Sequence, residues 1–500
     1  MTSNSNVPFV VLLSHDSFAI DMWKFSIDKE GNPYVDGVYY DGMIEKLYQM
    51  GYYKKYRGSN YVFIKEDDKV ISEVEVSMIK ETFFNTAIEA IDTNVKDMHV
   101  KISGKRLREE YLNRHKFVFD KQFLEHLPNH EGEILRDTKD KAYFCFKNTI
   151  VEVDKNGPTL VPYSSLLGKW VWEDQIIDRD IELATDVTNS HFLRFIFNVC
   201  NQEDDRIFSM FSAIGYLLHN HSSPTLGQAV IAYDEELSDR DNPMGGTGKG
   251  LFANALKQIR SVVKIDGKKF DSSDRFRYQD VSESTQIVWL DDIKPNFSFS
   301  TFHSVLTDGW SVEQKYKGQF FIDPNDSPKL YLCSNSILTG GGTTNVRRQH
   351  IIEFSNHYSR QIKKGNEEPI KTEHGCIFFD DWNSQEWNMF YTFMLMCVTH
   401  YLKEGLMTYE HRGLKKNTLL QATSEDFYTW TAEQEFITNV WYGTKKLYEL
   451  FIKLCYGGKA DLQQRGFTNW LRIYASCNGW ELKTKASNSI QLFSFAAKHQ

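Results

Sequence analysis

A glycine-rich segment near the middle of the chain has the residues needed to bind phosphate groups. It reads Gly245-Gly246-Thr247-Gly248-Lys249-Gly250, and it lies between a strand-like stretch, Ala229 to Tyr233, and a helix-like stretch that starts at Leu251. Glycines let successive backbone N–H groups turn toward phosphate oxygens, and the N-terminus of a helix adds partial positive charge. Lys249 would reach the β- and γ-phosphates of a bound nucleotide.

This segment departs from the phosphate-loop pattern G-x-x-x-x-G-K-[ST] at two positions. Pro243 takes the place of the first glycine, and Gly250 takes the place of the final Ser or Thr, whose hydroxyl would bind Mg²⁺. A water molecule is the simplest substitute for that hydroxyl. Taken alone, the segment is also compatible with a glycine-rich turn in which Lys249 is a solvated surface residue.

Polar residues follow two further strand-like stretches. Asp291 and Asp292 come directly after Gln286 to Leu290, and Asn335 lies two residues after Lys329 to Cys333. ATP hydrolysis needs a carboxylate that holds Mg²⁺ and a group that polarises the attacking water, and the two aspartates can divide these tasks. The Asn335 amide can hydrogen-bond the γ-phosphate or that water. Each ending is also ordinary turn chemistry, so it is their order along the chain that favours a nucleotide-hydrolysing site.

Basic residues occur at two more places of interest. Arg347 and Arg348 precede a strand-like stretch, and an arginine that reaches a neighbouring subunit's γ-phosphate would stabilise the transition state. The alternative is a pair of surface arginines that serve solubility. Residues 307–321 are typical of a β-hairpin with Lys315, Tyr316 and Lys317 near its tip, which suits phosphate contact and base stacking on a single strand. An exposed hairpin edge protected by lysines has the same sequence.

The elements around these residues predict an α/β fold with a parallel sheet. Residues 228 to about 360 alternate strand-like and helix-like stretches, and an open parallel sheet would bring the polar strand ends to one edge. Residues 191–220 are expected to be helical. Tyr143 to Val153 followed by Thr159 to Val161 predicts a hairpin, and 61–64 and 70–71 predict short strands.

The C-terminal region is expected to be mostly helical. Apolar residues recur at helical spacing in 390–397, 447–454 and 467–474, and strand-like stretches follow at 480–483 and 490–495. Helix, helix, strand, strand is the order of a winged-helix module, whose second helix would begin near Gln463 and contact DNA. Residues 431–500 hold nine Lys or Arg against five Asp or Glu. A small helical cap with a solvated face is the alternative.

Composition limits the class of protein. The 500 residues carry 58 Lys or Arg against 67 Asp or Glu, a net charge of −9, which excludes a generally basic nucleic-acid binder but not a local basic channel. Seven cysteines without a C-x-x-C pair argue against a disulfide framework and a structural zinc site. The N-terminus lacks a basic signal region, and the longest apolar stretch is shorter than the about 20 residues that span a bilayer. We expect a cytoplasmic protein with no membrane partner.

The order of the central segments resembles that of the superfamily 3 helicases of the AAA+ class, which occur in small viruses, phages and plasmids. The resemblance is strongest to the helicase part of phage and plasmid primase-helicases of the poxvirus type, and it covers residues 140 to 360 best. By this resemblance, Gly245 to Gly250 is motif A, Ile287 to Asp292 motif B, Thr307 to Lys317 the B-prime segment and Leu332 to Asn335 motif C. Arg347 or Arg348 is the arginine finger, and the pattern does not choose between them.

The resemblance implies an ATPase and DNA helicase of phage or plasmid replication that uses ATP and Mg²⁺. It implies an AAA+-like P-loop core that assembles into a ring, usually a hexamer, with ATP at the subunit interfaces. Single-stranded or forked DNA would pass through the central pore, and the helicase would move along it in the 3′ to 5′ direction. Lys249 would bind the phosphates, Asp291 would hold Mg²⁺, Asp292 would polarise water and Asn335 would sense the γ-phosphate. Lys315, Tyr316 and Lys317 would grip the DNA strand.

Relatives often carry a fused primase, but residues 1–140 lack the Asp-x-Asp strand of its two-metal site. A separate primase or polymerase would then be a partner. We therefore expect four parts: an N-terminal α/β accessory domain (1–185), a helical linker or collar (186–227), the ATPase core (228–375) and a helical C-terminal module with a winged-helix order (376–500).

One alternative from another class stays open. A non-hydrolysing, ATP-switched initiator or loader would use the off-pattern phosphate loop to bind nucleotide and the C-terminal module to bind an origin. ATP turnover that rises with single-stranded DNA separates the two hypotheses.

Overall fold

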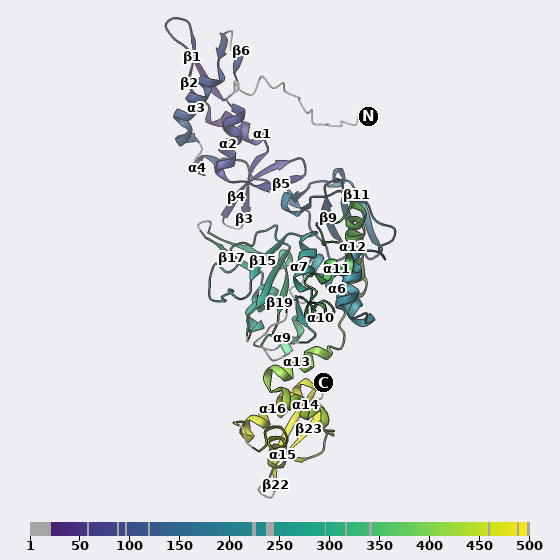
Figure 1. The fold of residues 1–500 in the computed structure, drawn as a ribbon. Coiled ribbons are helices and arrows are strands. Elements are labelled where there is room, and N and C mark those ends of the chain that lie inside the picture. Colours follow the sequence, from purple (N-terminus) through teal and green to yellow (C-terminus); the bar gives the residue numbers. More distant parts are fainter. Residues whose placement is uncertain are drawn as a thin grey trace, which may run out of the picture. The chain divides into compact units, whose positions relative to one another are not determined.

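The structure, a computed structural model, describes residues 22–57, 60–87, 90–95, 98–118, 121–222, 227–236, 245–295, 297–315, 318–339, 343–458, 461–487 and 490–497. Figure 1 labels many of its elements. The chain divides into two compact units: the first comprises the described residues up to Leu135 with 162–176 and 319–321, and the second comprises the rest. No helix within these ranges is both long and apolar enough to cross a membrane.

The first unit is a mixed α/β structure. Its elements are β1 (Trp23–Ile27), β2 (Pro33–Val38), α1 (Tyr40–Gln49), β3 (Tyr52–Arg57), β4 (Asn60–Asp67), β5 (Val70–Glu73), α2 (Val76–Ala87), β6 (Ile91–Val95), β7 (Met98–Ile102), α3 (Gly104–Val118), α4 (Lys121–Leu124), β8 (Glu133–Ile134) and β12 (Lys169–Trp172). The main sheet has the order β3-β4-β5-β12-β8, and Met43, Phe83 and Leu107 from three helices share one core. The strands expected at 61–64 and 70–71 are confirmed as parts of β4 and β5.

A small sheet and three helices open the second unit. They are β9 (Ala142–Phe146), β10 (Ile150–Asp154), β11 (Gly157–Val161), β13 (Ile176–Ile177), α5 (His191–Val199), α6 (Asp204–Leu218) and the later helix α12 (Ser384–Glu404). The predicted hairpin is confirmed, because β10 and β11 pair antiparallel around a turn at 155–156. Its first strand is shorter than predicted, because the chain turns after Phe146 and Tyr143 lies in a separate strand, β9, that pairs antiparallel with β10. The helical stretch expected at 191–220 is two helices, separated by a turn at 200–203.

A five-stranded parallel sheet forms the centre of the second unit and confirms the expected α/β fold. Its strands are β14 (Ala229–Asp234), β15 (Val262–Asp266), β16 (Ile287–Ile293), β19 (Lys329–Ser334) and β20 (Gln349–Phe354). The spatial order is β15-β16-β19-β14-β20, and all neighbouring pairs are parallel. Strand β19 therefore lies between β14 and β16 although it follows both in sequence, so the residue after β19 lies between the ends of these two strands.

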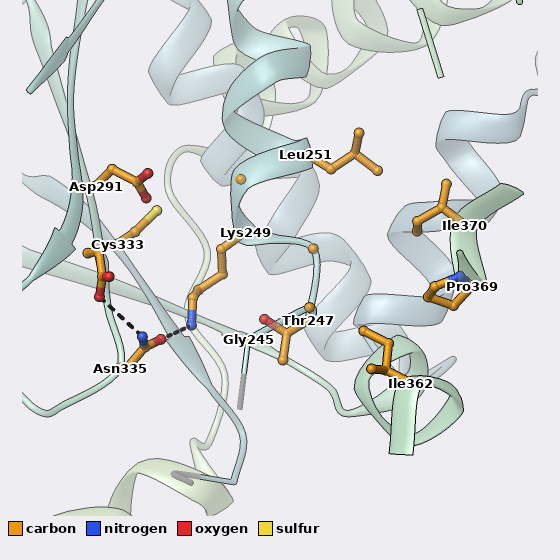
Figure 2. Close-up of a pocket in the computed structure, with 14 residues that line it drawn as sticks. Gly245, Thr247, Lys249, Leu251, Asp291, Cys333, Asn335, Ile362, Pro369 and Ile370 are labelled. Atoms are coloured by element: carbon orange, nitrogen blue, oxygen red, sulfur yellow. Dashed lines mark hydrogen bonds between the residues drawn. The ribbon is translucent and has the colours of Figure 1, made fainter. Parts of the chain in front are cut away.

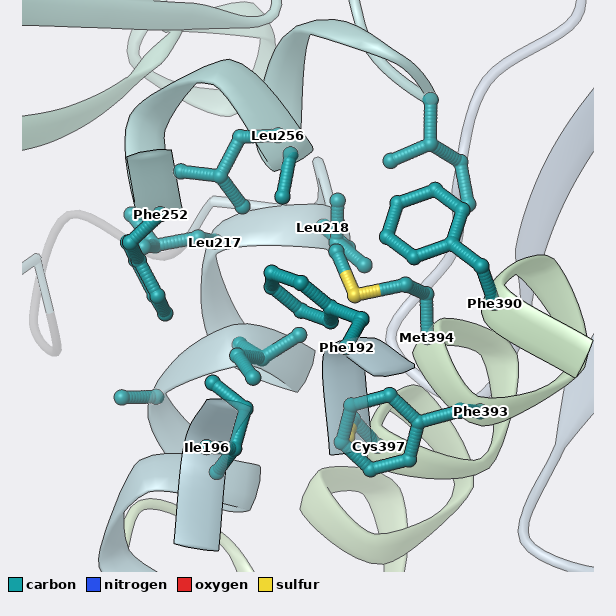
Figure 3. Close-up of a cluster of buried hydrophobic side chains, with 14 of the residues drawn as sticks. Phe192, Ile196, Leu217, Leu218, Phe252, Leu256, Phe390, Phe393, Met394 and Cys397 are labelled. Carbon is teal, nitrogen blue, oxygen red and sulfur yellow. The ribbon is translucent and has the colours of Figure 1, made fainter. Parts of the chain in front are cut away.

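One face of this sheet packs on helices. Alternate strand residues such as Val230, Trp289 and Tyr331 belong to one buried cluster with side chains from α5, α6, α12 and α7 (Lys249–Lys257). Figure 3 shows Phe192, Leu218, Phe252, Phe390 and Met394 meeting in this cluster. Apolar residues at helical spacing bury a stripe of each helix against the others. The packing holds α7 firmly, and α7 begins at the lysine of the glycine-rich segment.

Short elements connect the sheet strands and follow them. They are α8 (His303–Thr307), β17 (Trp310–Gln314), β18 (Gly318–Ile322), α9 (Thr343–Arg347), α10 (His357–Lys363), α11 (Pro369–His374) and α13 (Arg412–Ala422). Strands β17 and β18 form the two-stranded sheet expected of the predicted hairpin.

The C-terminal residues form an aromatic-rich core of their own. The elements are α14 (Glu425–Glu433), β21 (Tyr442–Gly443), α15 (Thr444–Tyr456), α16 (Gln464–Cys477), β22 (Trp480–Ser487) and β23 (Ile490–Ala497). The antiparallel sheet has the order β21-β23-β22. Phe427, Phe451, Phe467 and Phe493 are fully buried together. The predicted start of the second helix is confirmed, because Gln463 is the N-cap of α16.

Candidate nucleotide-binding site

The glycine-rich segment turns sharply into the N-terminus of α7. Gly248 caps the helix with a φ of 107°, and Gly246 has a φ of 88°, a region in which side chains are strained. Space is also lacking, since a Cβ on Gly248 would lie 2.8 Å from the Phe195 ring and one on Gly246 2.3 Å from Ile362 Cδ1. A Cβ on Gly250 would meet nothing within 4 Å. Backbone conformation and lack of space thus require glycine at positions 246 and 248 but not at position 250.

Two polar groups hold the side chain of Lys249. Its Nζ lies 2.6 Å from Asp234 Oδ2. It also donates a hydrogen bond to Asn335 Oδ1 at 2.8 Å, which Figure 2 shows. Asp234 ends β14 and is 2% exposed, while the Lys249 side chain is 12% exposed. The second Asp234 oxygen, Oδ1, accepts a hydrogen bond from Thr247 Oγ1 at 2.6 Å. One buried carboxylate therefore fixes both the lysine and the loop before it.

Asn335 connects the phosphate loop with the acidic strand end. Its Oδ1 accepts from Lys249, and its Nδ2 donates to Asp292 Oδ1 at 3.2 Å. The amide can make both contacts because β19 lies between β14 and β16. Lys249, Asn335 and Asp292, which the sequence predicts to act together, are brought into one hydrogen-bonded chain.

The two aspartates form an irregularity inside β16. The strand continues past them to Ile293, with a register shift between Leu290 and Ile293, and Asp292 has a φ of 55°. A bulge of this kind re-aims a side chain, and positive φ at a non-glycine residue is strained and favours functional positions. The strand thus does not simply end at Asp291, as the sequence pattern suggested, but is bent to present both carboxylates at the pocket.

Lysines neutralise both aspartates. Lys264 Nζ lies 2.7 Å from Asp291 Oδ2, and Lys268 Nζ lies 2.5 Å from Asp292 Oδ2. Carboxylate oxygens are the ligands that Mg²⁺ prefers, usually one or two of them together with phosphate oxygens and water. Asp291 and Asp292 are partly exposed and line the same pocket as the phosphate loop, so their chemistry and position fit Mg²⁺ bound to a nucleotide.

A pocket of 490 Å³ collects these groups. Its polar side holds Lys249, Asn335 and the aspartates, and its other side holds Ile362, Pro369 and Ile370 from α10 and α11 (Figure 2). Cys333 also lines it, and burial raises the pKa of its thiol to about 12, so the sulfur stays protonated and is no nucleophile at neutral pH. A polar end beside an apolar wall suits a ligand that has a phosphate chain and a flat ring.

The arginines lie away from this pocket. Arg347 and Arg348 precede β20 at the opposite edge of the sheet, where the Arg348 carbonyl accepts from the N–H of Ala229, the first residue of β14. Neither arginine lines the pocket. Lys315 follows β17 and is exposed, and Tyr316 and Lys317 lie outside the described residues. Within one chain, Arg347, Arg348 and Lys315 are not brought to the pocket of the phosphate loop.

Helix α13 hydrogen-bonds to the backbone next to the site. Asn417, which is 1% exposed, donates through Nδ2 to the carbonyls of Asp234 at 3.2 Å and Glu235 at 3.0 Å. Gln421 brackets Ile337, accepting from its N–H at 2.8 Å and donating to its carbonyl at 3.2 Å. The helix that leads into the C-terminal residues thus touches the chain beside both partners of Lys249.

Sequence reasoning missed several members of this site. Asp234 has the same signal as Asp291, a carboxylate after an apolar strand, and could have been found by it. Lys264 and Lys268 sit among ordinary charged residues, and the apolar wall from Ile362 to Ile370 depends on how α10 and α11 fold back. No local pattern marks these.

No protein-family model and no curated protein sequence matches the chain. Among solved structures, an apo form of the C-terminal region of NrS-1 is similar, with a TM-score of 0.41 and 11% identity over 91% of this chain and 98% of that one. A second apo structure of that region, residues 305–718, gives a TM-score of 0.39 and 12% identity over 91% and 98%. Similarity this low defines neither fold nor function, so the site itself must carry the functional argument.

Proposed function

We propose that this protein is an ATP-dependent DNA helicase of the superfamily 3, AAA+ type that acts in phage or plasmid replication. The observation that carries the proposal is the meeting of Lys249, Asn335 and the Asp291–Asp292 pair in one pocket at the N-terminus of α7. These are the three kinds of group that phosphoryl transfer to water requires: a phosphate-binding cation, a metal ligand and a group that orients water.

Each residue has a part in ATP hydrolysis. The loop N–H groups and Lys249 bind the phosphate chain, and Asp291 is the ligand for Mg²⁺, which when bound neutralises charge on the β- and γ-phosphates. Asp292 polarises the attacking water, and Asn335, in contact with both Lys249 and Asp292, orients that water against the γ-phosphate. Gly250 lacks a hydroxyl, so a water molecule would take the place of that ligand when Mg²⁺ is bound.

The position of the arginines favours a ring. An arginine finger at the amino ends of the strands, away from its own phosphate loop, would act on the nucleotide of a neighbouring subunit. Resemblance to superfamily 3 helicases suggests six subunits, with the hairpin of β17 and β18, including Lys315, facing DNA in the pore.

The C-terminal residues supply a second DNA contact. Helices α14, α15 and α16 with the sheet β21-β23-β22 have the connectivity of a winged-helix module. The exposed residues Arg465, Asn469 and Arg472 recur along one side of α16, and α16 contains no acidic residue. Such a face suits the phosphates and base edges of a DNA duplex. Lys483 and Lys485 on β22 are exposed as well.

ATP turnover tests the proposal. Wild-type protein should hydrolyse ATP with Mg²⁺, faster when single-stranded DNA is added, and should separate forked DNA in preference to RNA. Lys249→Ala should lose both activities. Lys257→Ala, which removes an exposed lysine at the far end of the same helix, should keep them. Full DNA-stimulated turnover in the Lys249→Ala protein would rule the assignment out.

A second candidate is an ATP-switched initiator or loader that binds DNA without hydrolysis. The missing hydroxyl at Gly250 and the basic face of α16 favour it. It predicts ATP binding with no turnover, and duplex binding that changes with ATP and weakens in Arg465→Ala and Arg472→Ala. Lys445→Ala, on the neighbouring helix α15, is the matched control for the loss of one exposed charge.

A further inference from the structure

Asp234 is a buried carboxylate that the hydrolysis scheme does not use. It lies 2.6 Å from Lys249 Nζ and is 2% exposed, and it does not line the pocket into which a nucleotide would fit. Its other oxygen accepts from Thr247. Both carboxylate oxygens are thus engaged by the phosphate loop from the side away from the ligand.

The carboxylate cannot move away easily. Asp234 is the last residue of β14, where it lies opposite Phe354 of β20, and its carbonyl accepts a hydrogen bond from the buried Asn417. The next acid along the chain, Glu235, pairs with Arg206 at 3.2 Å rather than with Lys249. Among the described residues, Asp234 is therefore the one acid that pairs with Lys249.

This pairing has a consequence for phosphate binding. The Lys249 charge is neutralised before any nucleotide arrives, so the phosphates meet a lysine whose field is largely cancelled at short range. Opposite charges a few ångströms apart in a partly buried site attract strongly, and a like charge at similar distance opposes the ligand as strongly. The contacts of Asp234 with Lys249 and Thr247 also hold the loop in place beside the pocket.

We propose that Asp234 is a positioning residue that holds Lys249 and Thr247 in the nucleotide-free state and thereby sets a weak affinity for the β- and γ-phosphates. The inference rests on the proposed nucleotide site and assigns control of its nucleotide affinity to one residue. Binding of ATP or ADP then requires Lys249 to be shared between Asp234 and the phosphate chain, so the site releases its product more readily than a site without this acid.

The test is the affinity for nucleotides measured by calorimetry on the full chain with Mg²⁺. Asp234→Asn removes the charge but keeps an oxygen that can accept from Thr247. We expect about tenfold tighter binding of ATP and ADP, and no gain for AMP, because Lys249 reaches only the β- and γ-phosphates. Glu235→Gln, the matched control, removes the neighbouring acid and should leave all three affinities unchanged.

Two further variants make the result decisive. Asp234→Ser, also neutral but smaller, should tighten ATP binding in the same direction, which guards against a folding defect particular to Asn. In the double variant Asp234→Asn with Lys249→Ala the gain should vanish. In turnover assays KM for ATP should fall in Asp234→Asn while kcat does not rise.

Unchanged or weaker ATP binding in folded Asp234→Asn and Asp234→Ser proteins would overturn the inference. Weaker binding that excess Mg²⁺ restores would overturn it too and would make Asp234 a metal ligand. If neither the wild-type protein nor any variant binds ATP, the proposed function itself fails, which is a different outcome from wild-type binding that Asp234 does not affect.

Discussion

Asn335 Nδ2 donates a hydrogen bond to Asp292 Oδ1 at 3.2 Å, across the carboxyl edge of the central sheet. Asp292 lies in β16, and Asn335, 43 positions later, directly follows the neighbouring strand β19. Asn335 also accepts a hydrogen bond from Lys249. A shift of the lysine side chain would therefore move the Asn335 amide and, with it, the hydrogen bond to Asp292. Asp292, which we propose polarises water, and Lys249, which we propose binds phosphate, are therefore positioned by a common residue.

Removing either end of this contact should separate binding from turnover. We expect Asp292→Asn and Asn335→Ala to lower kcat for ATP by about 10²- to 10³-fold, since each removes a group that acts on the reacting water or the charge at the γ-phosphate. The affinity for ADP should change little. Asp266→Asn, at the end of β15 and paired with Lys269, is the control and should keep the wild-type rate. Equal losses of affinity and rate would contradict these roles.

Substitutions should show which glycines of the phosphate loop are needed for its backbone conformation. Gly248→Ala places a methyl 2.8 Å from Phe195 in a strained backbone region, so nucleotide binding should be lost. Gly250→Ala meets open space inside a helix and should raise stability by roughly 0.5–1 kcal/mol. Chemical denaturation and nucleotide titration of both variants check this.

The same free space at Gly250 allows a gain of function. Gly250→Ser restores the hydroxyl of the common pattern without a clash, and we expect a lower Mg²⁺ requirement for ATP turnover. An unchanged Mg²⁺ dependence would show that the metal lies away from the start of α7.

Mixed subunits should reveal which arginine acts between chains. Arg347 is exposed at the end of α9, whereas Arg348 is partly buried, so we expect Arg347→Ala to lose about 10³-fold or more in kcat and Arg348→Ala to lose less. Mixing inactive Arg347→Ala with inactive Lys249→Ala protein should restore activity, because some interfaces then combine an intact lysine with an intact arginine. Failure to complement would place the arginine's action within its own chain.

The buried Lys329 should make stability depend on pH. Burial lowers its pKa to about 7, and its Nζ donates to the His221 carbonyl at 2.8 Å and lies over the Tyr216 ring. In the unfolded chain the pKa returns to about 10.4. Between these values the unfolded state binds more protons than the folded one, so stability rises with pH, and the penalty for the charged form is fully present below pH 7.

Lys329→Met isolates this effect. Relative to the wild-type protein, the variant should be more stable at pH 6, and that advantage should shrink by a few kcal/mol as the pH rises to 9. Urea unfolding at both pH values measures the difference. An advantage that does not change with pH would mean that Lys329 is charged in the folded state across this range.

The sequence predicted the strand ends and the loop because each has a local signature. An apolar run followed by Asp291-Asp292, or a glycine cluster followed by Lys249 and a helix, can be recognised without any long-range contact. The start of the helix near Gln463 could also be predicted from a local sequence pattern. The turn after Phe146 was missed, since Tyr143 to Val153 contains no glycine or proline to mark it.

The remaining features depend on topology. The place of β19 between β14 and β16 decides that Asn335 touches both Lys249 and Asp292, and the opposite edge holds Arg347 and Arg348 only because β20 pairs parallel with β14. Lys264 becomes a partner of Asp291 through the parallel pairing of β15 with β16, and Lys268 reaches Asp292 from the turn after β15. These relations join residues that are distant in sequence, so local patterns contain no information about them.

The contacts of α13 link ligand binding at the C-terminal residues to nucleotide binding. Asn417 touches the chain at Asp234, Gln421 touches it at Ile337, and the helix continues toward the C-terminal residues. Any ligand of those residues that displaces α13 must alter nucleotide affinity, and by reciprocity nucleotide must alter the affinity for that ligand by the same factor. Two titrations, each made with and without the other ligand, would give one coupling constant.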